Sequence, residues 1–237
     1  MDNRVELINK LNGHEHFQKY PRLTPWIGSR YSENKILIIG ESHYLPKGAT
    51  YHHDAEKWYA GNEWELKEHI KENCFDEADR LHGISYINTS GILKARSTDI
   101  SPEERKSFKA KGHTIYRNLF TTINSSPKFK HQNYLDVIDQ VAYYNCFQRP
   151  AEKTGGSIDV TSLDKDMAKS TLKLVLNTLQ PELIIVASRK AGKLIKPLIP
   201  NYEFVITAHP SSVWWNRLTK KGNCGRSDLT QFLAKHV

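Results

Sequence analysis

Cysteine is scarce in this chain of 237 residues. The three cysteines, Cys74, Cys146 and Cys224, lie far apart, and none belongs to a Cys-x-x-Cys pair. An odd and sparse set of cysteines is typical of proteins in a reducing, intracellular compartment. It also argues against a structural zinc site or a four-cysteine iron–sulfur cluster, because both need clustered thiolates.

Long hydrophobic runs are absent as well. No apolar run approaches the roughly 20 residues that span a bilayer, and the first ten residues, "MDNRVELINK", are too polar for a signal peptide. We therefore expect a cytoplasmic protein with no membrane partner. The sequence contains no internal repeat, low-complexity tract or linker, so its length favours one domain over residues 1–237.

Positive charge, in contrast, is in excess. The chain has 34 Lys and Arg against 26 Asp and Glu, which gives a net charge of +8 and a pI near 9.2. This balance favours a polyanionic partner such as nucleic acid, but it does not identify one. A hydrophobic fraction of 38% is enough for the core of a globular protein.

Strand-like and helical segments alternate along the chain, which predicts an α/β fold with a mostly parallel sheet. Continuous or mixed apolar runs predict four strands, at residues 35–39, 139–145, 183–187 and 203–208. Apolar residues at helical spacing predict helices at residues 114–123, 164–179, 190–198 and 228–235. Residues 50–112 are polar and rich in Trp, His and charge, so we interpret them as a helical and loop insertion.

Polar and aromatic side chains follow each predicted strand. The segments are Gly40–Pro46, Asn145–Arg149, Ala187–Lys190 and His209–Asn216. In an open parallel sheet, ligands bind beyond the carboxyl ends of the strands. Four such segments together therefore favour a binding or active site at this edge of the sheet.

The order of these segments resembles the uracil-DNA glycosylase superfamily. "GESHY" after the first strand is similar to the first motif of that family (GQDPYH, GINPG or GEAPG), and "AHPSS" is similar to its second motif, HPSP. Between them, "VAYYN" and "IIVASRKAGK" resemble the family's strand that ends in Asn and its Gly-Ser strand end before a helix. The ordered set spans roughly residues 35–233 and is moderately specific.

The resemblance implies a three-layer α/β/α sandwich around the four strands and hydrolysis of the N-glycosidic bond of a flipped uracil or other modified base in DNA. His209 would donate to the anionic base, Asn145 would read its amide edge, and Tyr44 would wall the pocket. Ser188 and Ser211 would contact phosphates, and Val213, Trp214 or Trp215 would fill the gap in the duplex. The remaining implied base contacts are Gly40, Ser42 and Phe147, and the remaining implied DNA contacts are Arg189, Lys190 and Ser212.

The first motif departs from the family pattern. Ser42 stands where an Asp or Asn normally handles the attacking water, and a serine hydroxyl is no carboxylate base at neutral pH. Glu41 and His43 are therefore the candidate groups for positioning or activating water, alongside His209 as the third catalytic candidate. The second motif reads HPSS in place of HPSP.

Two other classes remain open. Ser42 favours a catalytically inactive nucleobase or nucleic-acid binding module of the same fold, and the 50–112 insertion favours a hydrolase of free nucleosides or another small ligand. The expected partner is single- or double-stranded DNA, bound by a monomer that needs no metal or organic cofactor. His52 and His53 beside Asp54 fit a solvated surface better than a metal site. The turn Lys153–Ser157, "KTGGS", lacks the spacing of a P-loop.

Overall fold

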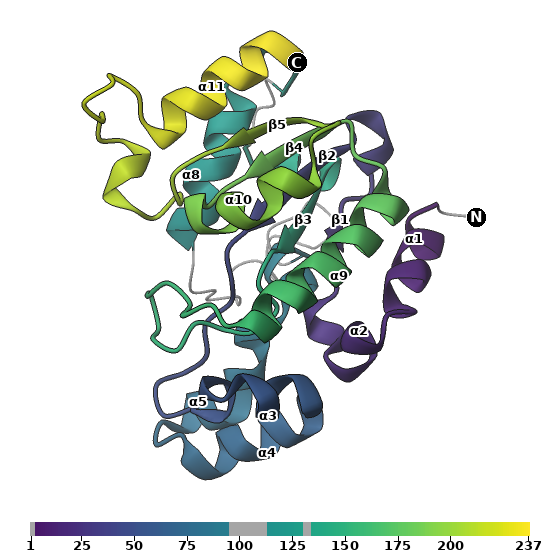
Figure 1. Ribbon diagram of the computed structural model, residues 1–237, viewed down its shortest axis with the longest axis vertical. Coiled ribbons are helices and arrows are strands. Elements are labelled where there is room, and N and C mark those ends of the chain that lie inside the picture. The colour runs from purple at the N-terminus through teal and green to yellow at the C-terminus, as the bar shows by residue number, and fades with distance from the viewer. Residues whose placement is uncertain (1–2, 95–112, 130–133) are drawn as a thin grey trace. The chain divides into compact units, whose positions relative to one another are not determined.

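The computed structural model describes residues 3–94, 113–129 and 134–237 (Figure 1). The chain divides into two compact units. Unit 1 consists of Met1–Trp26, Glu41–Ile92 and Asn145–Gln180, and unit 2 consists of Ile27–Gly40, Leu93–Tyr144 and Pro181–Val237. Each unit is therefore built from three separated stretches of sequence, and the prediction of a single domain stays a prediction.

A five-stranded sheet organises unit 2. The strands are β1 (Trp26–Ile27), β2 (Ile36–Gly40), β3 (Val141–Asn145), β4 (Leu183–Val186) and β5 (Glu203–Ile206), in the order β1-β3-β2-β4-β5. This confirms the α/β class and the four predicted strands. The predicted count of four was wrong by one. The missing strand is β1, which has only two residues and is too short to show an apolar period.

The central strands of this sheet are parallel and buried. In β2 and β4, Ile36 pairs with Leu183 and Ile39 with Val186, and β4 pairs with β5 in the same parallel sense. Residues 36–39 are fully buried, as expected of a continuous β-branched run with both faces covered. Because the register is parallel, the carboxyl ends of β2, β4 and β5 lie at one edge.

Helices complete unit 2. They are α8 (His113–Asn124), α10 (Arg189–Ile195) and α11 (Gly225–His236), with 3-10 helices η2 (Tyr31–Glu33), η5 (Pro127–Phe129), η6 (Tyr134–Gln140), η7 (Lys196–Leu198) and η8 (Val213–Trp215). α8 and α11 pack together, α10 packs on β4, and α11 packs on β5 (Figure 1). These ranges confirm the predicted helices of this unit.

Unit 1 is mainly helical. It contains α1 (Asn3–Asn12), α2 (Glu15–Lys19), α3 (Ala55–Ala60), α4 (Glu63–Asn73), α5 (Glu77–His82) and α9 (Ser162–Leu179), with 3-10 helices η1 (Pro21–Leu23), η3 (Tyr51–His53) and η4 (Gly83–Ile87). α6 (Thr89–Lys94) begins in it. Helices α1 and α3 pack on α9, and the Tyr20 ring stacks on Trp58 at 4.4 Å between centroids.

A capping box starts α9. The Thr161 hydroxyl accepts from the Asp164 N–H at 3.2 Å, and the Asp164 carboxylate accepts from the Thr161 N–H at 2.8 Å. Two N–H groups at the start of the helix are thus satisfied. The helix ends at Gln180, which takes a left-handed conformation (φ 45°) just before Pro181.

The predicted insertion at 50–112 is helical over its described part, where α3, α4 and α5 lie together in unit 1 (Figure 1). Residues 95–112 lie outside the described residues. Within the described part of the chain, no helix has the length and apolar character needed to cross a membrane.

Candidate functional site

The predicted site residues fall into two groups, one in each unit. Unit 1 holds Glu41, Ser42, His43, Tyr44, Asn145 and Phe147. Unit 2 holds Gly40, Ser188, Arg189, Lys190, His209, Ser211, Ser212, Trp214 and Trp215.

In unit 2, the strand ends bring three predicted residues to one edge of the sheet. Gly40 ends β2, Ser188 follows β4, and His209 follows β5. The parallel ladder continues past the strands, since the Ala187 N–H donates to Ile39 (2.8 Å) and the Thr207 N–H donates to Val186 (2.9 Å). The sequence prediction that these ends share an edge is therefore confirmed within this unit.

The Ser188 side chain has a structural function at this edge. Its hydroxyl accepts from the Ala191 N–H at 3.2 Å and caps α10, and the residue is fully buried. Arg189 and Lys190 occupy the first turn of the same helix, with Arg189 exposed. An exposed cation beside a helix start suits a phosphate contact better than the buried hydroxyl does.

The His209 ring is oriented by its own turn. Its Nδ1 accepts from the Ser211 N–H at 3.4 Å and lies 2.9 Å from the Ser211 hydroxyl. A backbone N–H can only donate, so in the neutral ring the proton is on Nε2. The same turn is tied to α8, because the Asn118 amide donates to the Pro210 carbonyl at 2.7 Å. His209 therefore presents a hydrogen-bond donor, and Asn118, which the sequence reasoning missed, supports it.

The two adjacent tryptophans have different surroundings. Trp215 is 1% exposed and packs against Gly225, where a Cβ would lie 2.9 Å from the indole. Trp214 is 44% exposed, and the Arg217 guanidinium lies 5.5 Å from the centroid of its ring. Of the two tryptophans, Trp214 is therefore the one that contacts solvent. The exposed indole with a stacked cation is the arrangement that could contact a nucleobase.

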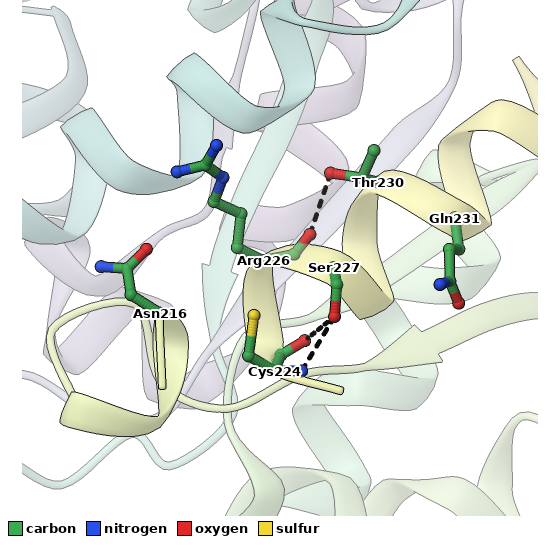
Figure 2. Close-up of a pocket in the computed structure, with 6 residues that line it drawn as sticks. All are labelled: Asn216, Cys224, Arg226, Ser227, Thr230 and Gln231. Carbon is green, nitrogen blue, oxygen red and sulfur yellow. Dashed lines mark hydrogen bonds between the residues drawn. The ribbon is translucent and has the colours of Figure 1, made fainter. Parts of the chain in front are cut away.

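A surface pocket lies beside this turn in unit 2. It has a volume of about 640 Å³ and is lined by Asn216, Cys224, Arg226, Ser227, Thr230 and Gln231 (Figure 2). The Ser227 hydroxyl bonds the Cys224 backbone at both its N–H (2.8 Å) and its carbonyl (2.9 Å), so it is occupied by the helix cap. None of the predicted site residues lines this pocket.

In unit 1, the segment after β2 lies along the segment after β3. The carbonyls of Glu41 and His43 accept from the N–H groups of Phe147 and Ala151, both at 2.9 Å. Asn145 and Phe147 are buried, whereas Glu41, Ser42 and Tyr44 are half-buried. The structure thus brings together the first motif and the Asn-containing segment, which the sequence predicted from topology.

Glu41 carries the accessible carboxylate of this group. The Ser157 hydroxyl donates to its Oε1. Burial raises the pKa of the Tyr44 phenol, and the Glu41 charge raises it further. Burial and the same charge also raise the pKa of the Cys146 thiol. The carboxylate therefore lies within electrostatic reach of both groups.

His43 has the opposite surroundings. It is 6% exposed, its Nε2 lies 2.9 Å from the Thr89 hydroxyl, and it is also bonded to the backbone of Tyr86. Burial lowers its pKa to about 4. These contacts favour a structural role for His43, as a neutral ring that supports the loop. They do not favour a role in activating water.

No protein-family model and no curated protein matches this chain. The function of the chain is therefore inferred from the geometry of its residues and the resemblance of its motifs.

Proposed function

We propose that this chain binds DNA and hydrolyses the N-glycosidic bond of a flipped, modified base, with a three-layer fold of the uracil-DNA glycosylase type. The observation that carries the proposal is the His209 ring at the carboxyl end of β5. Because Ser211 donates to Nδ1, the neutral ring carries its proton on Nε2 and can act as the donor that the family resemblance implies. A departing base anion needs such a donor at its oxygen.

The surface of unit 2 supports DNA as the partner. Trp214 and Val213 are exposed large apolar side chains, and the Arg217 guanidinium lies over the Trp214 ring. The Ser212 hydroxyl is buried and has no hydrogen-bond partner among the described residues, so the exposed side chains of this turn are the ones that could contact DNA. The net charge of +8 favours a polyanion over a neutral ligand.

Glu41 is the group that we assign to the sugar. Loss of the base leaves positive charge on the sugar ring, which an ionised carboxylate stabilises while water attacks. Ser42 provides no such charge, and the buried ring of His43 is engaged with Thr89. Asn145 and Tyr44 keep the base-binding roles that the family resemblance implies.

The alternative is a binding module that has kept the fold without the reaction. Ser42 favours it, because the residue stands where the family places its water-handling Asp or Asn. The buried state of His43 favours it as well, since one of the two substitutes for that group is not accessible. A cytoplasmic location and a monomeric state stay predictions.

Base release from defined oligonucleotides tests the proposal. Single- and double-stranded DNA with uracil, hypoxanthine or oxidised bases is incubated with the protein and treated with alkali to cleave abasic sites. We expect strand scission with the wild type, a loss of about 100-fold or more in His209→Ala, and no change in His82→Ala, which alters an exposed histidine of α5. Salt-sensitive binding without scission supports the module, and absence of both contradicts DNA as the partner.

A further inference from the structure

The side chains of Ser157 and Glu41 meet although 116 residues separate them in the sequence. The Ser157 hydroxyl donates to the Oε1 of Glu41, and both residues belong to unit 1. Motif comparison did not select Ser157, because it lies in the turn Lys153–Ser157, which lacks the spacing of a P-loop. The contact places a neutral donor on the one carboxylate that we assign to the reaction.

The loop that carries Ser157 is bonded along the whole first motif. Phe147 and Ala151 donate backbone N–H groups to the carbonyls of Glu41 and His43, and the Thr154 hydroxyl donates to the carbonyl of Leu45, each at 2.9 Å. The carbonyl of every second residue from Glu41 to Leu45 thus accepts a hydrogen bond from this loop. The two N–H bonds hold the backbone at Glu41 and His43, whereas the Thr154 hydroxyl contacts only Leu45, which is not a candidate site residue. Ser157 alone of this set reaches the Glu41 side chain.

Buried groups hold the far end of this loop. Ile158, next to Ser157, is fully buried, and the carbonyl of Asp159 accepts from the Arg149 guanidinium at 2.7 Å. Arg149 is itself 1% exposed and bonded twice to Asp164, at 2.8 and 3.0 Å. The Ser157 hydroxyl is therefore presented from a supported backbone, although its side chain is exposed.

We propose that Ser157 is a positioning residue that orients the Glu41 carboxylate toward the sugar of the bound nucleotide. The inference rests on the proposed function and names a residue that the motifs do not include. A hydroxyl that donates to one carboxylate oxygen restricts the side-chain torsions of the Glu and leaves its negative charge in place. A Lys or Arg partner would offset that charge. Orientation matters because small misplacements of a reacting group cost about 100-fold in rate.

The first measurement is the rate of base release by three variants. Ser157→Ala removes the donor, and we expect kcat to fall about 10- to 100-fold with KM within about twofold of the wild type. Ser157→Thr keeps a hydroxyl and should restore most of the rate. Thr154→Val is the matched control, since it removes a hydroxyl of the same loop that bonds only the Leu45 backbone, and its kcat should stay within about threefold.

The second measurement does not depend on turnover. Affinity is compared for two duplexes, one with a cationic pyrrolidine and one with a neutral tetrahydrofuran in place of the target sugar. An oriented carboxylate should favour the cationic analogue by about 10-fold, and Ser157→Ala, but not Thr154→Val, should lose most of this preference.

The outcomes separate the inference from the proposed function. If the wild type prefers the cationic analogue, Ser157→Ala loses this preference and no base is released, then hydrolysis is wrong and the role of Ser157 stands. If Ser157→Ala equals the wild type in both measurements, the positioning role is overturned while hydrolysis stands. If the wild type binds neither duplex, both are overturned.

Discussion

Glu41 and His43 are separated by one residue, and their side chains differ in what surrounds them. The Glu41 carboxylate is half-buried and accepts from Ser157, whereas the His43 ring is buried against Thr89. Desolvation disfavours the protonated form of a buried imidazole, which is why the pKa of His43 is lowered to about 4. The neutral ring therefore contributes to stability as long as it stays unprotonated.

This gives a prediction for stability against pH. In the unfolded chain the pKa of His43 returns to about 6.5, so between pH 6.5 and 4 the unfolded state binds more protons than the folded state. The stabilisation is present above the unfolded pKa and is lost as pH falls toward the folded pKa. Between pH 7 and pH 5, His43 should account for a loss of about 2 kcal/mol in the free energy of unfolding.

Denaturant unfolding at several pH values measures this loss. His16 and His52 add to it in the wild type, because burial lowers their pKa values to about 3 and about 4. His43→Gln should therefore be less sensitive to acid than the wild type by the stated amount. His82→Ala should keep the wild-type slope, and an unchanged slope in His43→Gln would show that the ring is not buried neutral.

At the scale of elements, the loop after β3 and the helix α9 are joined through one guanidinium. Arg149 donates to both oxygens of Asp164 in the first turn of α9, to the carbonyl of His52 (2.7 Å) and to the carbonyl of Asp159 (2.7 Å). Burial raises the pKa of the Asp164 carboxyl, but the bonds from Arg149, the Thr161 N–H and Tyr59 outweigh it, so the pKa lies below its usual value. Arg149 and Asp164 form a buried ion pair, and each charge is stabilised in the interior by the other.

Removal of one partner should be costly. We expect Arg149→Met to lower the free energy of unfolding by about 3–5 kcal/mol, because it leaves the Asp164 charge buried and unpaired. Lys153→Met is the control, since it removes an exposed cation from the same loop and should change stability by less than about 0.5 kcal/mol. Chemical denaturation measures the free energy of unfolding of both variants. Equal losses in Arg149→Met and Lys153→Met would contradict the ion-pair argument.

The secondary structure of the chain was largely predictable from local patterns. Residues 36–40 and 183–186 are strands because β-branched runs tolerate burial on both faces, and α9 follows from its apolar period and its stop before Pro181. β1 was missed because two residues carry no pattern. The predicted solvated surface at His52 was wrong, since the residue is buried and its Nε2 lies 3.0 Å from the Ala151 carbonyl.

At the scale of the whole molecule, the net charge of +8 makes any DNA binding electrostatic in part. Contact with roughly three phosphates would lower the affinity about 10- to 100-fold between about 50 mM and about 200 mM salt. Fluorescence anisotropy with a labelled oligonucleotide measures this slope. Trp214→Ala should weaken binding at each salt concentration and leave the slope unchanged, because the indole is uncharged; an affinity independent of salt would contradict nucleic acid as the partner.

The sequence by itself determined the class of fold, four of the five strands and the segments that follow them, because each depends on residues close together in the chain. It also determined the α-helices of unit 2. Tertiary structure decided which side chains of those segments are accessible. Trp214 is exposed while Trp215 is buried, and Glu41 is accessible while His43 is not. It also decided the partner of Glu41, since a contact between residues 41 and 157 depends on how distant segments pack, and no local pattern records that.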